Sequence, residues 1–323
     1  MRRPFPFLTL SILILTAAAL AIRLPRLDQR PMHGDEANQA VKAAMLAGLM
    51  PEAGGYRYDP TEHHGPTLYW LTWPSLWLSG AADFAETTEF DYRIVPVLFG
   101  AGLVVLLLLA AGGLGRGPIV VAALLTAVSP AMVYYARYYV QETLLVFFTF
   151  AALGCGWQFL RTRRDGWAAA AGASLGLMHA TKETWVLAAF SMAAGLVLTL
   201  LWSRWRDGTP WTLRPYFRPA PLLAGLAAAC LVAVAFYSSF GADWRGPLDS
   251  ILAYATYFRR GSEGGIHAAP WYEYLHLLVA FRPARGFFWT EGLIVGLAAV
   301  GCVVSLFRRK RLSTEYSVPS TQY

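Results

Sequence analysis

Runs of apolar residues about 20 long recur along this chain and limit its fold more than any other feature. The 323 residues are 56% hydrophobic and only 15% charged, and the mean hydropathy is +0.41. Polar backbone groups inside a bilayer must be paired within the protein, and no alternating barrel pattern is present, so each run is expected to be a helix. The sequence therefore predicts an all-α polytopic membrane protein with about eight transmembrane helices. The predicted spans are residues 5–22, 94–112, 118–134, 143–160, 167–180, 185–202, 222–240 and 286–307.

Arginine and lysine gather in three short segments that follow predicted spans, and these segments set the orientation. Cytoplasmic loops are enriched in Lys and Arg, so these ends are expected inside. With the N-terminus also inside, two long segments, 23–93 and 241–285, fall outside and are expected to fold over the site. We predict one transmembrane domain, 1–307, and a basic cytoplasmic tail, 308–323. The basic segments are 161–164, 204–218 and 308–311.

A shorter apolar stretch, 66–78, carries Pro74 and three tryptophans. It is too short to cross a bilayer and is predicted to be a juxtamembrane helix in the outer interface. On this topology all of the 20 acidic residues except Asp165, Asp207 and Glu315 lie outside. Chemistry is therefore expected on the extracytoplasmic face of the cell membrane. The net charge of +7 follows from topology, and no basic patch with interleaved aromatic residues argues for nucleic acid.

His33-Gly34-Asp35-Glu36 directly follows the first predicted span. Two adjacent carboxylates beside a bilayer can deprotonate an acceptor hydroxyl or hold a divalent cation. Asp35 is also expected to begin an amphipathic helix, where a carboxylate near the N-terminus is favoured by about 0.3–1 kcal/mol. That structural role would account for Asp35 but not for Glu36 beside it. We therefore predict that Asp35 and Glu36 are catalytic.

Acids, histidines and aromatic residues gather further along the same outer segment, and Tyr58 is a candidate substrate-binding residue there. The adjacent His63 and His64 lack the i, i+4 spacing of a zinc-binding helix, which argues against a metal site. One of them is predicted to contact a phosphate or to close the pocket, while Gly65 and Pro66 turn the chain toward the interfacial helix. A solvated turn is the alternative.

Arg137 and Glu142 lie at the next predicted outer turn among four tyrosines, and Lys182 lies with Glu183 at the third. Arg137 and Lys182 are predicted to bind a phosphate, because arginine binds phosphate bidentately and lysine acts as a point charge. Glu142 would be a further acid, able to hold a divalent cation such as Mg or Mn together with Asp35. An aromatic belt with snorkelling charges, and a self-paired Lys182–Glu183, are the alternatives.

Arg259, Arg260 and His267 lie with several aromatic residues in the second outer segment. Ring faces stack on the C–H surfaces of a pyranose, and arginines bind phosphate. These three residues are therefore predicted to bind the substrate.

The order of these motifs resembles that of the GT-C superfamily of membrane glycosyltransferases. The resemblance rests on the acidic pair after the first span, a His-Gly-Pro before an aromatic interfacial helix, Arg93 at the start of the next span, and an Ala-Arg-x-x-x-Gln-Glu turn. The chain is most similar to the protein O-mannosyltransferase and lipid A aminoarabinose transferase branch, and within it to a prokaryotic flippase-activity-associated family. The resemblance implies a sugar donor carried on polyprenyl phosphate and transfer at the outer face.

The same resemblance implies roles for single residues. Asp35 matches the acid of the first outer loop, the expected base, with Glu36 as its neighbour. Glu142 matches the acid of the second loop. His64 stands where relatives carry a Lys or His that faces the carrier phosphate directly before a proline, but here Gly65 intervenes.

These observations predict a hexosyltransferase-like glycosyltransferase that transfers a sugar from a polyprenyl-phosphate donor to a protein, lipid or glycan acceptor. Attack by a hydroxyl on the anomeric carbon needs a base on the acceptor side and positive groups on the leaving phosphate, and a single displacement inverts that carbon. The alternative is a non-catalytic flippase- or transport-associated protein that binds the lipid-linked sugar, and a scaffold subunit is a third. Transporters place ionisable residues near the bilayer midplane, whereas the charges here lie at span ends, which favours the enzyme.

Overall fold

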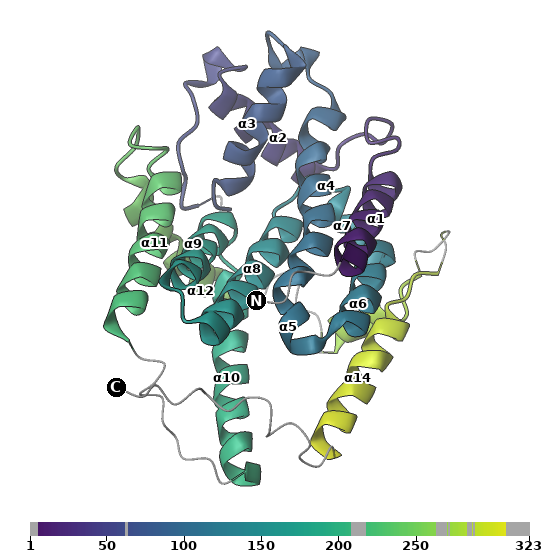
Figure 1. Cartoon of the computed structure of the whole chain (residues 1–323). Coiled ribbons are helices and arrows are strands. Elements are labelled where there is room, and N and C mark those ends of the chain that lie inside the picture. Colours follow the sequence, from purple (N-terminus) through teal and green to yellow (C-terminus); the bar gives the residue numbers. More distant parts are fainter. Residues whose placement is uncertain are drawn as a thin grey trace. The chain divides into compact units, whose positions relative to one another are not determined.

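Helices form almost all of the regular structure in the part of the chain described by the computed structural model (Figure 1). That part comprises residues 6–61, 64–207, 218–262, 270, 272–282, 286 and 288–307, with side chains described at all of these except 6, 207 and 257–262. Within it, strand-type pairing is limited to two isolated bridges. The predicted all-α fold is confirmed.

The chain divides into two compact units, Met1–Ala268 and Ala269–Tyr323. In the second unit α13 (Glu273–Val279) and α14 (Gly292–Phe307) are joined by a segment in which Phe281 and Trp289 form an antiparallel bridge. The helices of the first unit are α1 (Pro6–Arg23), α2 (Gly34–Ala47), α3 (Thr67–Ser79), α4 (Glu89–Leu106), α5 (Ala111–Leu114), α6 (Arg116–Val128), α7 (Pro130–Ala136), α8 (Glu142–Thr162), α9 (Asp165–Thr181), α10 (Trp185–Asp207), α11 (Pro219–Tyr237) and α12 (Gly246–Ser262). Three short 3-10 helices, η1 (Pro51–Ala53), η2 (Phe84–Glu86) and η3 (Leu107–Ala110), also belong to the described part of this unit.

All eight predicted spans contain a helix, but the described helices differ in length. Four are long and apolar enough to cross a bilayer: Glu89–Leu114, Glu142–Thr162, Trp185–Arg206 and Pro219–Tyr237. The pair α6 and α7 would make a fifth, although it bends by 56°. The apolar parts of α1 and α14 are shorter. The chain is thus a multi-pass membrane protein, and the count of eight spans stays a prediction.

The bend between α6 and α7 has a local cause at Ser129 and Pro130. The ring of Pro130 lacks the N–H that would continue the hydrogen-bond ladder of α6, and it suits the first position of a new helix. The Ser129 hydroxyl accepts a hydrogen bond from the backbone N–H of Met132 at 3.2 Å and so caps α7. A predicted straight span is therefore two helices.

Close backbone packing joins α9 to α11. A methyl group at Gly172 would lie 1.9 Å from the carbonyl oxygen of Gly225. Small residues at such contacts let membrane helices approach closely without large side chains between them. This pair of helices forms one side of the first unit, and α8 packs on its other side.

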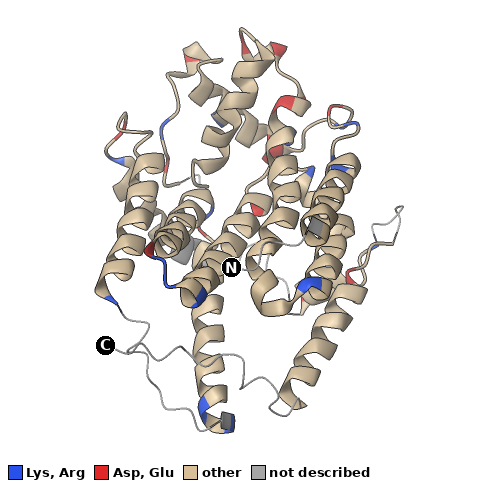
Figure 2. Ribbon diagram, in the orientation of Figure 1, with Lys and Arg blue, Asp and Glu red and all other residues tan. Residues whose placement is uncertain are grey.

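The predicted interfacial helix corresponds to α3, which packs on α2 and α4 and contains Pro74. Its inner face is buried in the larger hydrophobic core, while Trp73 and Trp77 stay exposed. In Figure 2 the ribbon positions of acidic residues gather at the α2–α3 end of the first unit, and basic positions lie at the far end of α10. The core residues around α3 are Ala40, Leu68, Tyr69, Leu76, Tyr92, Tyr139, Leu144, Phe148 and Met178.

Candidate active site

Glu36 is a buried structural anion and not a residue of the open site. Its side chain is 0% exposed. Oε1 accepts hydrogen bonds from Arg93 Nε at 2.8 Å and from the Tyr139 backbone N–H at 2.9 Å. Oε2 accepts from Arg30 Nη2 at 2.7 Å, Arg93 Nη2 at 3.0 Å and the His33 backbone N–H at 3.2 Å. Burial alone raises the pKa of Glu36, but the hydrogen bonds from Arg93, Tyr139 and His33 outweigh it and hold that pKa below its usual value.

The predicted catalytic role of Glu36 is corrected by this placement. A carboxylate with five donors and no exposed surface has no free position from which to accept a substrate proton. Its interactions instead join α2, the segment before α2, α4 and the turn before α8. Glu36 therefore holds the segments that surround the site in fixed positions relative to one another.

Asp35 takes the opposite orientation. Its side chain is 69% exposed and lines the cavity described below. The cap of α2 is formed by His33, whose Nδ1 accepts from the Asp35 backbone N–H at 3.3 Å, with Glu36 completing a capping box. Because neighbouring residues supply the cap, the Asp35 carboxylate remains available, and the N-terminus of α2 stabilises its negative charge.

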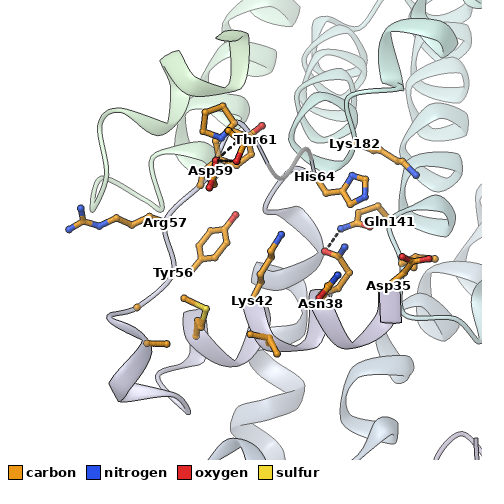
Figure 3. A pocket seen from close by; sticks show the side chains of 18 of the residues that line it. Asp35, Asn38, Lys42, Tyr56, Arg57, Asp59, Thr61, His64, Gln141 and Lys182 are labelled. Atoms are coloured by element: carbon orange, nitrogen blue, oxygen red, sulfur yellow. Dashed lines mark hydrogen bonds between the residues drawn. The ribbon is translucent and has the colours of Figure 1, made fainter. Parts of the chain in front are cut away.

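A cavity of about 1160 Å³ opens beside α2 (Figure 3). Its walls come from α2, the segment 53–61, His64, the turn before α8 and Lys182, which directly follows α9. Segments far apart in the chain thus meet around one space. Of the predicted site residues, Asp35, Tyr58, His64, Glu142 and Lys182 line it.

Two tyrosines contribute protonated hydroxyl groups to this region. Tyr58 is 6% exposed, and its ring packs edge-on against Tyr237 with centroids 4.7 Å apart. Burial and the negative charge of Glu183 raise the pKa of Tyr58. Burial and the neighbouring Asp35 carboxylate raise the pKa of Tyr138 to about 12. Both hydroxyls therefore stay protonated at neutral pH.

His64 is held against the end of α9 by backbone and side-chain contacts. His64 and Lys182 form an antiparallel bridge, and the Gly65 N–H donates to the Thr181 carbonyl at 3.2 Å. A methyl group at Gly65 would lie 2.0 Å from the Ala180 carbonyl oxygen, so only glycine allows this approach. Gly65 between His64 and Pro66, a departure from the expected motif, is thus the residue that seats His64 beside Lys182.

Lys182 and Glu142 form an ion pair at the cavity wall. Lys182 Nζ lies 2.6 Å from Glu142 Oε1. This contact replaces the self-pair of Lys182 with Glu183 that was the alternative interpretation. Glu183 instead pairs with His64, with Oε2 3.2 Å from Nδ1. The other Glu142 oxygen, Oε2, is enclosed and has no hydrogen-bond partner in the described structure.

A divalent cation is predicted at Asp35 and Glu142. Lys182 Nζ already lies beside Glu142 Oε1, and its positive charge opposes a cation at that oxygen. Among the described residues, no group of three or more His, Cys, Asp or Glu side chains could hold a metal ion. The divalent cation at Asp35 and Glu142 stays a prediction.

Arg137 does not line the cavity, which corrects its predicted role as a phosphate ligand. Its guanidinium donates to the carbonyl oxygens of Ile22, Arg23 and Pro25 at 3.3, 2.8 and 2.8 Å. These carbonyls belong to the end of α1 and the residues that follow it, where cations are favoured by the helix dipole. Arg137 therefore anchors the turn before α8 to α1.

Three predicted substrate-binding residues are not placed in the site. The backbone of Arg259 and Arg260 belongs to α12, but the structure does not describe their side chains. His267, like His63, lies outside the described residues altogether. Their predicted roles stay predictions.

Four polar residues of α2 line the cavity, and only Asp35 among them was predicted. Asn38, Gln39 and Lys42 follow Asp35 at i+3, i+4 and i+7, the spacing of one helix face. In Figure 3 Asn38 and Lys42 project from α2 into the cavity. Helical spacing from Asp35 is the signal that could have identified them. Gln141, which precedes Glu142, also lines the cavity.

Solved structures of membrane glycosyltransferases share this fold. The apo structure of ArnT from Cupriavidus metallidurans is 19% identical with a TM-score of 0.60, and the match covers 83% of this chain and 47% of that one. The S. cerevisiae Pmt1–Pmt2 protein O-mannosyltransferase complex bound to the sugar donor is 17% identical with a TM-score of 0.57, covering 76% and 35%. The apo oligosaccharyltransferase of Archaeoglobus fulgidus is 13% identical with a TM-score of 0.51, covering 96% and 40%.

The chain spans less than half the length of each of these proteins, and at such identities the likeness concerns the fold. Curated protein sequences give no significant match. The family model described as dolichyl-phosphate-mannose-protein mannosyltransferase matches residues 71–241, from within α3 to just after α11. The match extends over more than half of the chain, and the predicted resemblance to the O-mannosyltransferase branch is confirmed at the level of family and fold. The chain therefore belongs to the dolichyl-phosphate-mannose-protein mannosyltransferase family.

Proposed function

We propose that this chain is a glycosyltransferase that transfers a sugar from a polyprenyl-phosphate donor to an acceptor at the outer face of the cell membrane. The observation that carries the proposal is the exposed Asp35 carboxylate in a cavity that also receives Lys182 and His64. Family membership supports the reaction class. The Pmt1–Pmt2 structure holds a sugar donor and a second ArnT structure holds undecaprenyl phosphate, which supports a lipid-phosphate donor.

Asp35 is the general base in this mechanism. Its carboxylate takes the proton of the acceptor hydroxyl while that oxygen bonds to the anomeric carbon. The bond between the anomeric carbon and the phosphate oxygen breaks, and its electron pair leaves with polyprenyl phosphate. A positioned base contributes roughly 10²–10⁴-fold to such a rate. One displacement at one carbon inverts its configuration.

Lys182 stabilises the leaving phosphate. Its ammonium carries three donors, of which Glu142 Oε1 engages one, so it can hold Glu142 and still reach a phosphate oxygen. His64 lies beside it, oriented by Glu183 through the contact at Nδ1. Positive charge that is fixed before the reaction lowers the energy of the transition state without reorganisation. No step of this mechanism passes through a divalent cation.

The position of the cavity suits a lipid-linked donor. Asp35 lies at the start of α2, Glu142 at the start of α8 and Lys182 directly after α9. The predicted topology assigns all of these helix ends to the outer side. A polyprenyl tail can then lie along the spans while its phosphate and sugar enter the cavity.

A protein that only bound the lipid-linked sugar would need cations for the phosphate but no exposed base. The two functions therefore differ in what Asp35 does. In a transferase, Asp35→Asn should abolish release of polyprenyl phosphate and preserve donor binding. A binding protein would release no polyprenyl phosphate in either form, and the same change should leave its affinity for the donor unaltered.

The test uses the purified full-length chain with polyprenyl-phosphate mannose or glucose and a membrane extract that supplies acceptors. Release of polyprenyl phosphate is followed over time for wild type, Asp35→Asn and the control Asp165→Asn. Asp165 is an exposed acid at the start of α9, 3.8 Å from Arg218 and absent from the cavity lining. Turnover in wild type and the control but not in Asp35→Asn supports the proposal. Turnover at the wild-type rate in Asp35→Asn would remove Asp35 from the mechanism.

A further inference from the structure

Two glutamine side chains lie in the cavity wall although they are almost fully buried. Gln39 is 5% exposed and Gln141 is 1% exposed, and both line the cavity. A buried carboxamide costs free energy unless its donors and acceptor are satisfied. The hydrogen bonds of these two side chains therefore indicate which chemical groups this wall of the cavity can bind.

One oxygen receives both hydrogen bonds of this pair. Gln39 Oε1 accepts from the hydroxyl of Tyr69, which is 0% exposed, and from Gln141 Nε2 at 2.9 Å. A carboxamide oxygen has two lone pairs, so both are engaged. This arrangement fixes the orientation of the Gln39 amide, because rotating it would place an NH₂ group against two donors.

The same arrangement leaves one donor and one acceptor without a partner in the described structure. Gln39 Nε2 and Gln141 Oε1 make no hydrogen bond there, and neither is among the enclosed unsatisfied atoms. Both residues line the cavity, so these two atoms are the hydrogen-bonding groups that the pair can offer to a bound molecule. Gln141 directly precedes α8, yet its side chain makes no capping hydrogen bond and bonds Gln39 instead.

The pair is close to the proposed chemistry on both sides. Gln39 follows Asp35 by four positions on α2, and such neighbours have Cβ atoms about 5–6 Å apart. Gln141 directly precedes Glu142, which holds Lys182. Figure 3 shows Gln141 among Asp35, Asn38, His64 and Lys182, with its hydrogen bond to the other amide drawn as a dashed line.

We propose that Gln39 and Gln141, aligned by Tyr69, form the subsite that recognises a pair of neighbouring hydroxyl groups on the donor sugar. The proposal rests on the proposed function, since it assigns the sugar of that same donor. Each sugar hydroxyl both donates and accepts, so one hydroxyl meets Gln141 Oε1 and its neighbour meets Gln39 Nε2. A donor lacking one of these hydroxyls leaves a buried amide group unpaired, and such sites discriminate strongly.

The experiment measures equilibrium binding of polyprenyl-phosphate mannose and its 2-, 3-, 4- and 6-deoxy counterparts to the full-length chain. Binding does not require turnover, so the subsite is tested even if the transfer reaction fails. In wild type, loss of one of two neighbouring hydroxyls should weaken binding by roughly 10- to 100-fold. Gln141→Leu should weaken binding of the parent donor by a similar factor. The deoxy donor that lacks the hydroxyl bound by Gln141 should have the same affinity for this variant as for wild type.

Tyr69→Phe supplies the second variant, with Tyr139→Phe as its matched control. Removing the Tyr69 hydroxyl frees one lone pair of Gln39 Oε1 and lets the amide rotate. The difference in binding affinity between the parent and deoxy donors should therefore become smaller. Tyr139 is equally buried, and its hydroxyl forms a hydrogen bond with Thr72 at 2.8 Å and with neither glutamine in the described structure. Tyr139→Phe should keep the wild-type ranking of donors. The same loss for every donor in Gln141→Leu, or a wild-type protein that ranks all five donors equally, would overturn the subsite.

Discussion

The Arg93 guanidinium donates a hydrogen bond to each oxygen of the Glu36 carboxylate, from Nε to Oε1 at 2.8 Å and from Nη2 to Oε2 at 3.0 Å. Arg93 is 1% exposed and Glu36 0%. Two parallel hydrogen bonds between planar groups fix both distance and angle. This pair joins α4 to the start of α2, so the direction of Asp35 depends on it.

Glu36→Gln should destabilise the protein while Asp35→Asn should not. The substitution leaves the buried Arg93 without its anion, which costs about 3–5 kcal/mol when one partner of a buried pair is removed. Thermal unfolding in detergent measures the difference, with the exposed Asp35→Asn as the matched acid-to-amide control. Equal melting temperatures of the two variants would contradict a structural role for Glu36.

The same carboxylate predicts a pH dependence of stability. The pKa of folded Glu36 lies below its usual value of 4.5. A lowered pKa contributes stability that is fully present above the unfolded value and is lost as the pH falls through the folded value. Wild-type melting temperature should therefore drop below about pH 4.5 more steeply than that of Glu36→Gln, which cannot titrate at this position.

Asp35→Asn should reduce kcat by roughly 100-fold or more, because a carboxamide cannot accept the acceptor proton. KM for the lipid donor should change little, since the base contacts the acceptor side. Initial rates at several donor concentrations separate the two constants. A large rise in KM at unchanged kcat would assign Asp35 to binding instead.

Lys182→Gln should raise the apparent KM for the donor, because a fixed positive charge is removed from the carrier phosphate. The single change also leaves Glu142 unpaired, so the double variant Lys182→Gln with Glu142→Gln is needed to separate charge loss from ion-pair loss. Arg161→Gln, at the end of α8 remote from the cavity lining, is the control. A double variant with wild-type KM would mean that Lys182 acts only through Glu142.

Gly65→Ala should impair both stability and transfer, because its methyl group would overlap the Ala180 carbonyl at 2.0 Å. The backbone must move, and His64 would leave its place beside Lys182. Gly34→Ala is the matched control, since a methyl group at Gly34 meets nothing within 4 Å. Transfer activity and melting temperature, measured on both variants, test this difference between Gly65 and Gly34. A fully active Gly65→Ala would show that the His64–Lys182 bridge is dispensable.

The orientation in the membrane can be tested with single cysteines at Arg57 and Arg164 in whole cells. Arg57 is exposed at the cavity rim and Arg164 is exposed between α8 and α9. The basic cluster around Arg164 predicts a cytoplasmic location. An impermeant thiol reagent should therefore label Arg57→Cys and spare Arg164→Cys. The reverse labelling would place the cavity on the cytoplasmic side.

The helices could be predicted from hydropathy because crossing hydrocarbon leaves the backbone few choices. Asp35 could be predicted because an acid after a first span is a local signal. The role of Glu36 could not, since it depends on Arg93, which lies 57 positions away in sequence. Arg137 looked like an interfacial cation, but its carbonyl partners lie more than 110 positions earlier. Gln39 carried a helical-spacing signal that the prediction did not use.

The contact between His64 and Glu183 has a consequence for how the protein is synthesised. These two residues are separated by 119 positions, which take roughly 6–24 s to synthesise at about 5–20 residues per second. During that interval α2 and the residues up to His64 can already have emerged, but one wall of the cavity does not yet exist. A nascent or truncated chain that ends before α9 therefore contains Asp35 but not Lys182. On the proposed function, such a chain has no complete site until the residues that follow α9 have been synthesised.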